Sequence, residues 1–350
     1  MESLSTPVGF PAGIWLNSCC FGANRYEVKT PPQFLEPGAE AFADTDYQTC
    51  FQQAVSLEGG SRFRLFETEP GEGLDRWLTE VFERMLPIRP NDPDLLLPLD
   101  IVTDGSHCAA VFREEQPGCV PIRPYLSTPD APRWRLAISL FNRLRSLHGA
   151  GFCGDGFPRQ QILVDPNRWE VRLLIGRSLR LPGDRSMPHL RRPASDFLFL
   201  PEKTLQTLEE NGLPADGVLR DVFSAAVMAF YLLYYTHPFV GSAFRELTRP
   251  DMLPLYHDAP SFVFDPKGSN RLTMFDFERD SVSRWEQTMP ALRALFEDLF
   301  CAVGTYGGQP ADDTLSAAAW INALQEDEAK NSGETVTENY PFETTGHYRI

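Results

Sequence analysis

The pattern of apolar and polar residues divides the chain into a strand-rich first part and a helical second part. Up to about residue 115 the apolar residues come in short runs, and residues 62–66 alternate charged and apolar side chains as a half-buried strand does. Residues 71–86 instead repeat apolar side chains at helical spacing, which predicts one helix. The strands that this pattern predicts cover residues 14–16, 25–28, 62–66, 95–102 and 108–112.

From Pro132 onward the spacing of the apolar residues becomes helical. Helices are expected at residues 134–148, 217–235, 282–303 and 314–324, and a pair of strands at 161–164 and 171–175. The helix at 217–235 is apolar nearly all round, as a helix in the core of a large domain is. Its most apolar stretch, Val222–Tyr235, is too short to span a bilayer, so no membrane partner is expected.

A strand-rich lobe followed by a helical lobe predicts the α+β class and two lobes. The expected segments are an N-terminal extension at 1–13, a β-rich N-lobe at 14–115, a larger helical C-lobe at 116–325 and an acidic tail at 326–350. The tail carries six acidic residues against two basic ones and has few residues that could form a core. A segment of that composition is expected to be disordered and dispensable for the fold.

The net charge and the cysteines of the chain limit the classes of partner and the cellular compartment that we expect for it. The 350 residues carry a formal net charge of -16 at pH 7, so the chain is a poor candidate for non-specific binding to nucleic acid or to an anionic membrane. Its seven cysteines are scattered and form no C-x-x-C, which favours reduced thiols in the cytoplasm over disulfides or a zinc site. The six histidines form no H-E-x-x-H pattern and G-x-S-x-G is absent, so neither hydrolase signature is present.

The segment Phe152–Val164 carries the clearest functional signal. It reads F-C-G-D-G-F-P-R-Q-Q-I-L-V and follows the helix expected at 134–148. Protein kinases carry a loop of this layout, with an Asp, a Pro, an Asn and then an apolar strand. Asp155 and Pro158 match that loop, whereas Gln160 stands at the Asn position. The chain therefore resembles the protein kinase-like superfamily, with a catalytic loop that is altered in its chemistry.

Further motifs carry the resemblance over roughly residues 14–325. L-P-L-D-I-V at 97–102 and the run from Tyr256 to Arg271, which contains F-V-F-D-P and S-N-R, are similar to segments of bacterial kinase-like proteins. Those proteins are found with von Willebrand A-domain proteins and with phosphatase and tellurite-resistance genes. D-V-F-S at Asp221–Ser224 resembles the start of the family's central helix, whose Asp fixes the backbone of the catalytic loop.

The resemblance implies a catalytic Asp155, which in the family orients the substrate hydroxyl, and a metal-ligand position at Gln160. The decisive Mg²⁺ ligand of the family is the Asp of D-F-G, and Ile175, Gly176 or Arg177 stands there instead. No carboxylate lies between Glu170 and Asp184. Because Mg²⁺ requires hard oxygen ligands to offset the loss of its water shell, no metal site is expected.

The elements that would bind the nucleotide are also altered. Where the family has a glycine-rich loop over the phosphates, N-S-C-C-F-G at 17–22 retains only Gly22. The family's strand lysine is replaced by Arg64, for which Glu80 or Glu83 is the implied partner. The residues that the resemblance implies for nucleotide binding are Gly22, Arg64, Glu80, Glu83, Ala110, Val111, Phe112 and Gln160.

These features predict a pseudokinase, because those that maintain the fold persist while those that bind Mg²⁺-ATP are lost together. Such a protein would act as a regulator or scaffold for a protein partner that the sequence does not name, and ATP binding without Mg²⁺ stays open. Two alternatives also stay open. One is an atypical Ser/Thr kinase or nucleotidyl transferase that uses Asp155, and the other is a pure protein-interaction module.

Overall fold

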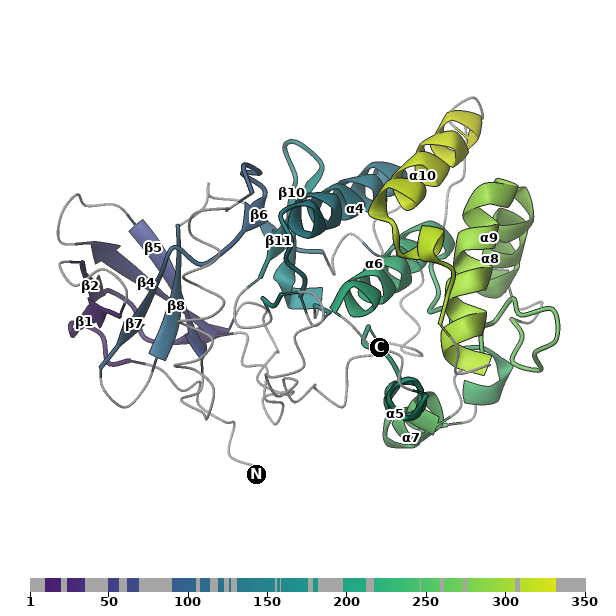
Figure 1. Cartoon of the computed structure of the whole chain (residues 1–350), viewed down its shortest axis with the longest axis horizontal. Helices are drawn as coiled ribbons and strands as arrows, with labels where there is room; N and C mark the ends of the chain where they lie inside the picture. The colour runs from purple at the N-terminus through teal and green to yellow at the C-terminus, as the bar shows by residue number, and fades with distance from the viewer. Residues whose placement is uncertain are drawn as a thin grey trace. The chain divides into compact units, whose positions relative to one another are not determined.

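The structure, a computed structural model of the whole chain, describes residues 10–19, 24–34, 50–56, 62–68, 90–104, 108–113, 119–122, 126, 131–154, 156–157, 159–175, 179–181, 198–211, 217–245, 247–258, 261–272, 276–305 and 309–331 (Figure 1). The chain divides into two compact units. Residues 1–122, 143–199 and 216–221 form the first, and residues 123–142, 200–215 and 222–350 form the second. The first unit therefore contains the whole strand-rich part together with the loop that resembles a catalytic loop.

The first unit contains an antiparallel sheet that curls until it closes on itself. The strand order is β2-β1-β7-β8-β5-β4-β3, and β2 also pairs with β4. The strands are β1 (Trp15–Ser18), β2 (Arg25–Val28), β3 (Gln33–Phe34), β4 (Cys50–Ser56), β5 (Arg62–Thr68), β7 (Asp100–Thr103) and β8 (Cys108–Arg113). An edge strand exposes unpaired N–H and C=O groups, and closure of the sheet leaves few such edges.

The apolar side chains of these strands pack into one cluster, formed by Leu16, Tyr26, Val28, Ala54, Val102, Ala109 and Val111. Phe10 belongs to the same cluster and is 1% exposed. The side-chain amide of Gln52 fixes Phe10 in place, since its Oε1 accepts from the Phe10 N–H at 2.8 Å and its Nε2 donates to the Phe10 carbonyl at 2.7 Å. The N-lobe therefore begins at least at Phe10, four residues before the start at residue 14 expected from the sequence.

A second, four-stranded sheet in the same unit has the order β6-β11-β10-β9. Its strands are β6 (Leu95–Leu96), β9 (Val120–Pro121), β10 (Ile162–Asp165) and β11 (Glu170–Leu174). The hairpin of β10 and β11 is the strand pair expected from the sequence. Buried Asp94 accepts hydrogen bonds from Arg143 and Arg168 and forms an ion pair with Arg172, all at 3.1–3.2 Å, so one carboxylate joins this sheet to the second half of helix α4 (Arg133–Gly149).

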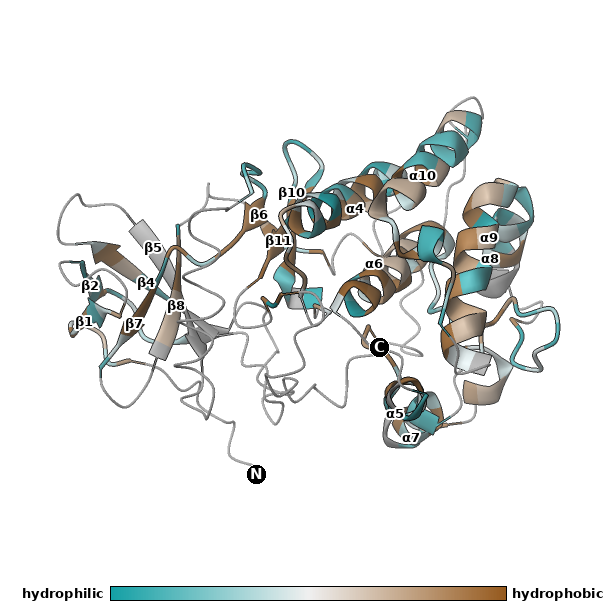
Figure 2. Ribbon diagram, in the orientation of Figure 1, coloured by the Kyte–Doolittle hydropathy of each residue, from teal (hydrophilic) through white to brown (hydrophobic). Residues whose placement is uncertain are grey.

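The second unit is helical. Its helices are α5 (Glu202–Glu210), α6 (Gly217–Tyr234, from Val222 on), α7 (Arg249–Asp258), α8 (Asp276–Gln287), α9 (Pro290–Phe300), a π-helical turn (Cys301–Thr305) and α10 (Ala317–Asn331). Phe230 lies at the centre of its core, with aromatic neighbours that include Trp285, Phe296 and Phe300 at 5.3–6.2 Å between ring centroids. Figure 2 shows α6 as predominantly hydrophobic. By length and composition α6 could cross a membrane, yet 89% of it is buried inside the protein, as in a core helix.

The sequence motifs of this unit have a structural explanation. Asn270 of S-N-R donates to the carbonyls of Phe239 and Ser261 at 2.8 and 2.7 Å, and its Oδ1 accepts from the Ala243 N–H. One buried amide therefore connects the segment that ends at Arg271 to residues 239–243, which follow α6.

Two expected boundaries are wrong. The single helix expected at 282–303 is two helices, because Pro290 has no N–H to continue a helix and instead begins α9. The tail expected from residue 326 begins later, since α10 runs to Asn331. Asp327 in this last part of α10 is 2% exposed, and it accepts from Trp134 Nε1 at 2.8 Å and from the Met289 N–H at 2.7 Å. The helix expected at 71–86 lies outside the described residues.

The α+β class predicted from the sequence is confirmed, as is the order of a curled β-sheet followed by helices. The units do not divide at residue 115, because residues 143–199 and 216–221 belong with the sheets.

Candidate functional site

The backbone of the loop that resembles a catalytic loop is fixed by Asp221, the fifth residue of α6. Asp221 is fully buried, and its Oδ2 accepts from the Gly154 N–H at 2.6 Å and lies 3.1 Å from His148 Nε2. Its Oδ1 accepts from the Gly156 N–H at 3.1 Å. The role that the resemblance implied for Asp221, binding the backbone of the loop, is therefore seen directly. Burial raises the pKa of the Asp221 carboxyl, and the hydrogen bond from His148 partly offsets that effect.

The two glycines of G-D-G are required by this geometry. A Cβ on Gly154 would lie 2.7 Å from Asp221 Oδ1, so any larger residue would push the carboxylate away. Gly156 has φ +75°, a left-handed conformation that residues with a Cβ rarely adopt. The sequence around Asp155 is thus explained by the approach of the backbone to Asp221.

The residues around the loop are mostly buried. Cys153, where kinases usually have His, is 1% exposed. Its N–H donates to the Arg180 carbonyl at 2.9 Å, and its carbonyl accepts from the Arg180 N–H at 2.8 Å. Gln160 lies in the 3-10 turn Arg159–Gln161, immediately before β10, and its side chain is outside the described atoms. Asp155 and Pro158 lie outside the described residues.

The position of the family's D-F-G carboxylate is apolar where the structure describes it. Strand β11 ends at Leu174, and Ile175 after it is fully buried, with its N–H bonded to the Leu96 carbonyl at 2.9 Å. Gly176 and Arg177 lie outside the described residues, and neither carries a carboxylate. The donors present here do not fit Mg²⁺. Within the described part of the chain, no group of three His, Cys, Asp or Glu side chains could bind a metal ion.

The residues expected to contact a nucleotide are only partly brought together. Arg64 on β5 pairs in register with Phe112 on β8, so these two backbones are neighbours. Strand β8 is paired on both sides, with β5 and with β7, and Ala110, Val111 and Phe112 are all buried. Val111 belongs to the apolar cluster of the sheet, so it faces away from the side that Ala110 and Phe112 share. Gly22, Glu80 and Glu83 lie outside the described residues.

A buried carboxylate that the sequence reasoning missed lies beside the β1–β2 hairpin. Asp100 is 1% exposed, although it is the first residue of β7 and stands between apolar residues. Its Oδ1 accepts from Ser18 Oγ at 2.7 Å and from the Ile101 N–H at 2.8 Å, and its Oδ2 accepts from Tyr26 Oη at 3.0 Å. The signal that could have revealed it was in L-P-L-D-I-V, where a charged residue interrupts a buried strand.

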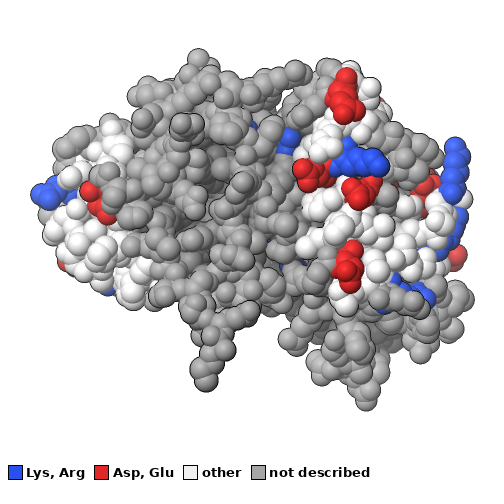
Figure 3. All heavy atoms as spheres, turned by 90° about the horizontal axis from the view of Figure 1, so that it is seen from below, with Lys and Arg blue, Asp and Glu red and all other residues white. Residues whose placement is uncertain are grey.

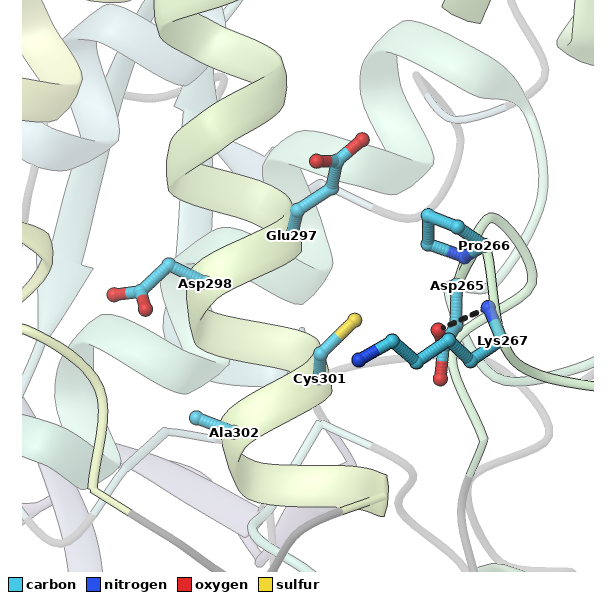
Figure 4. Close-up of a pocket in the computed structure, with 7 residues that line it drawn as sticks. All are labelled: Asp265, Pro266, Lys267, Glu297, Asp298, Cys301 and Ala302. Carbon is cyan, nitrogen blue, oxygen red and sulfur yellow. Dashed lines mark hydrogen bonds between the residues drawn. The ribbon is translucent and has the colours of Figure 1, made fainter.

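The second unit contains a separate pocket of about 260 Å³ between the 265–267 loop and the end of α9 (Figure 4). Burial, together with Asp265, Glu297 and Asp298, raises the pKa of the Cys301 thiol to about 12, which keeps it protonated and unreactive. The acids already have structural roles, since Asp265 accepts from the Lys267 N–H, and Asp298 accepts from Thr314 Oγ1 at 2.6 Å. Figure 4 shows Asp298 directed away from the Cys301 sulfur. This pocket is a poor candidate for a reactive site.

Among the described residues, the charged side chains do not gather into a single patch on the face shown in Figure 3. Among the described residues on that face, acidic and basic side chains are interspersed.

No protein-family model matches the chain, and no curated protein sequence matches it. Among solved structures, the chain is similar to the crystal structure of Rad53 1-466 in complex with AMP-PNP, with 14% sequence identity and a TM-score of 0.47. Rad53 is a protein kinase. The similarity covers 77% of this chain and 61% of that chain, so this chain spans less than two thirds of its length. A similarity of this size decides nothing about activity, ligands or partners.

Proposed function

We propose that this chain is a pseudokinase, a kinase-like protein that regulates or scaffolds a protein partner and does not catalyse Mg²⁺-dependent phosphoryl transfer. The observation that carries the proposal is a contrast within one loop region. Asp221 accepts two hydrogen bonds from the loop backbone and one from His148, whereas the metal-ligand position begins with buried Ile175.

The physical reason lies in what the metal contributes to the reaction. In kinases the metal ions neutralise the charge that develops on the transferred phosphoryl group, and the protein mainly positions the reactants. No carboxylate lies between Glu170 and Asp184, so this chain has no anionic ligand at the position that the family uses. Asp155 alone could orient a hydroxyl group, but it could not provide that neutralisation.

The hydrogen bonds that Asp221 accepts from the loop have a structural role that does not depend on catalysis. Asp221 is buried, and its hydrogen bonds would remain necessary for folding after catalysis was lost. A regulatory protein of this kind presents surfaces to a partner and does not turn over a substrate. The likeness to bacterial kinase-like proteins and the scattered cysteines support a protein partner and a cytoplasmic location as parts of the same proposal.

A metal titration tests the observation that carries the proposal. Mn²⁺, which is paramagnetic and can replace Mg²⁺, is titrated into the full chain and its free fraction is followed by electron paramagnetic resonance. We expect the same free fraction for the wild type and for Asp155→Asn. Retention of about one Mn²⁺ per chain that disappears in Asp155→Asn would overturn the proposal, because an intact carboxylate site would then exist.

A further inference from the structure

The β1–β2 hairpin is attached to β7 through a buried carboxylate. Ser18 ends β1 and Tyr26 lies in β2, and both hydroxyl groups donate to Asp100. The two strands of the hairpin are therefore bound to the same group. Burial and the nearby Asp100 raise the pKa of the Tyr26 phenol, which keeps it a hydrogen-bond donor.

The backbone N–H groups at the end of β1 and directly after it are already used. The Ser18 N–H donates to the Asn24 carbonyl at 3.0 Å, and the Cys19 N–H donates to the Ile101 carbonyl at 2.8 Å. A loop that binds phosphate does so through backbone N–H groups that point at the ligand. These two N–H groups cannot serve a phosphate unless the hairpin first separates from β7.

We propose that Asp100, with Ser18 and Tyr26, forms a latch that holds the two strands of the hairpin against β7, so that the N–H groups of Ser18 and Cys19 do not bind the phosphates of a nucleoside triphosphate. Charge acts in the same direction, because a carboxylate beside the hairpin repels an anionic ligand. The inference rests on the proposed function and extends it, since a protein without Mg²⁺ ligands could still bind ATP as a regulatory ligand.

The latch itself is tested by amide hydrogen exchange on the full chain. Ser18→Ala removes one hydrogen bond to Asp100 and leaves the strands intact, so the variant should fold. We expect exchange of the Cys19 amide, which bonds Ile101, to become about tenfold faster or more, because that amide exchanges when the hairpin opens. Gln325→Ala, at an exposed position of α10, is the control and should leave this amide unchanged. Equal exchange of Cys19 in the wild type and Ser18→Ala would overturn the latch.

The consequence for ligands is tested with a fluorescent ATP analogue, titrated into the full chain once with excess Mg²⁺ and once with EDTA. We expect either no binding or a Kd weaker than about 1 mM. Cys19→Glu adds a negative charge in the exposed part of the hairpin, and Gln325→Glu adds the same charge elsewhere.

Binding that Cys19→Glu weakens at least tenfold and Gln325→Glu does not would overturn the inference, because the phosphates would then lie at the hairpin. Binding that neither substitution affects would leave it standing, since the nucleotide would lie elsewhere. Nucleotide that binds at the hairpin without transfer of its phosphate would contradict this inference and leave the proposed function intact.

Discussion

The end of helix α10 offers a sharp test of the structure, because the sequence and the structure disagree there. Composition alone suggests that the chain can be cut after Gln325 without loss. In the structure that cut removes Asp327, whose two oxygens accept from Trp134 Nε1 and from the Met289 N–H. The hydrogen bonds join α10 to α4 and to the start of α9, so we expect the shorter chain to be destabilised.

The magnitude follows from the two hydrogen bonds. Each hydrogen bond to a charged group contributes about 1.5–3 kcal/mol. Both donors are only partly buried, so water can replace part of each bond, and we expect a net loss of about 2–4 kcal/mol for the chain that ends at Gln325. For a domain of this size that corresponds to a decrease in Tm of roughly 4–10 °C.

The assay compares chains that end at Gln325 and at Asn331 by thermal and urea unfolding, with the full chain as reference. The chain that ends at Asn331 retains all of α10 and should unfold like the full chain. Asp327→Ala in the full chain should reproduce most of the loss, whereas Glu326→Ala, exposed on the same helix, should not. Equal stability of the two truncated chains would refute the reasoning.

Other residues yield further predictions. Asp221→Ala should lower the free energy of unfolding by about 2–4 kcal/mol, because it leaves two backbone N–H groups and His148 without their acceptor. Asp221→Asn keeps one acceptor oxygen and should lower it less, and urea unfolding measures both variants. Cys301 should react with iodoacetamide at about pH 8 at least a hundredfold more slowly than an ordinary cysteine, because the pKa of its thiol is about 12. Peptide mass spectrometry measures the labelling, and equal labelling of Cys301 and exposed Cys19 would contradict this prediction. Burial raises the pKa of the Asp100 carboxyl above its usual value, so the folded state binds this proton more tightly than the unfolded state does. The contribution of the group to stability is therefore present at low pH and is lost as the pH rises through the folded pKa. The unfolding free energy of the wild type relative to Asp100→Asn should rise as the pH is lowered towards the folded pKa, and a difference that is independent of pH would contradict this.

The local features of the fold could be predicted from the sequence. The hairpin of β10 and β11, the buried helix α6 and the role of Asp221 each depend on a short pattern, either periodicity or a motif, and each is present in the structure. Closure of the sheet by β2 and β4 could not be predicted in this way, because residues 26–28 pair with residues 54–56 and no local pattern specifies a partner so far along the chain.

Buried charges account for the main errors. Hydropathy predicts that Asp327 is exposed to solvent, although Asp327 continues the buried face of Trp320 and Leu324 at helical spacing. Asp100 was missed for the same reason, since its burial depends on donors from two other strands. A carboxylate can occupy a buried position only when such donors are provided, and a single sequence does not show them.

The central claim is that the loop is retained without its chemistry, and phosphoryl transfer measures this most directly. Full-length protein is incubated with γ-labelled ATP, Mg²⁺ or Mn²⁺ and generic protein substrates, beside Asp155→Ala and an active kinase as positive control. We expect incorporation by the wild type to equal that of Asp155→Ala in every condition, because no carboxylate at the D-F-G position binds the metal. Incorporation by the wild type at rates typical of kinases, about 1–100 per second, that Asp155→Ala abolishes would contradict the account.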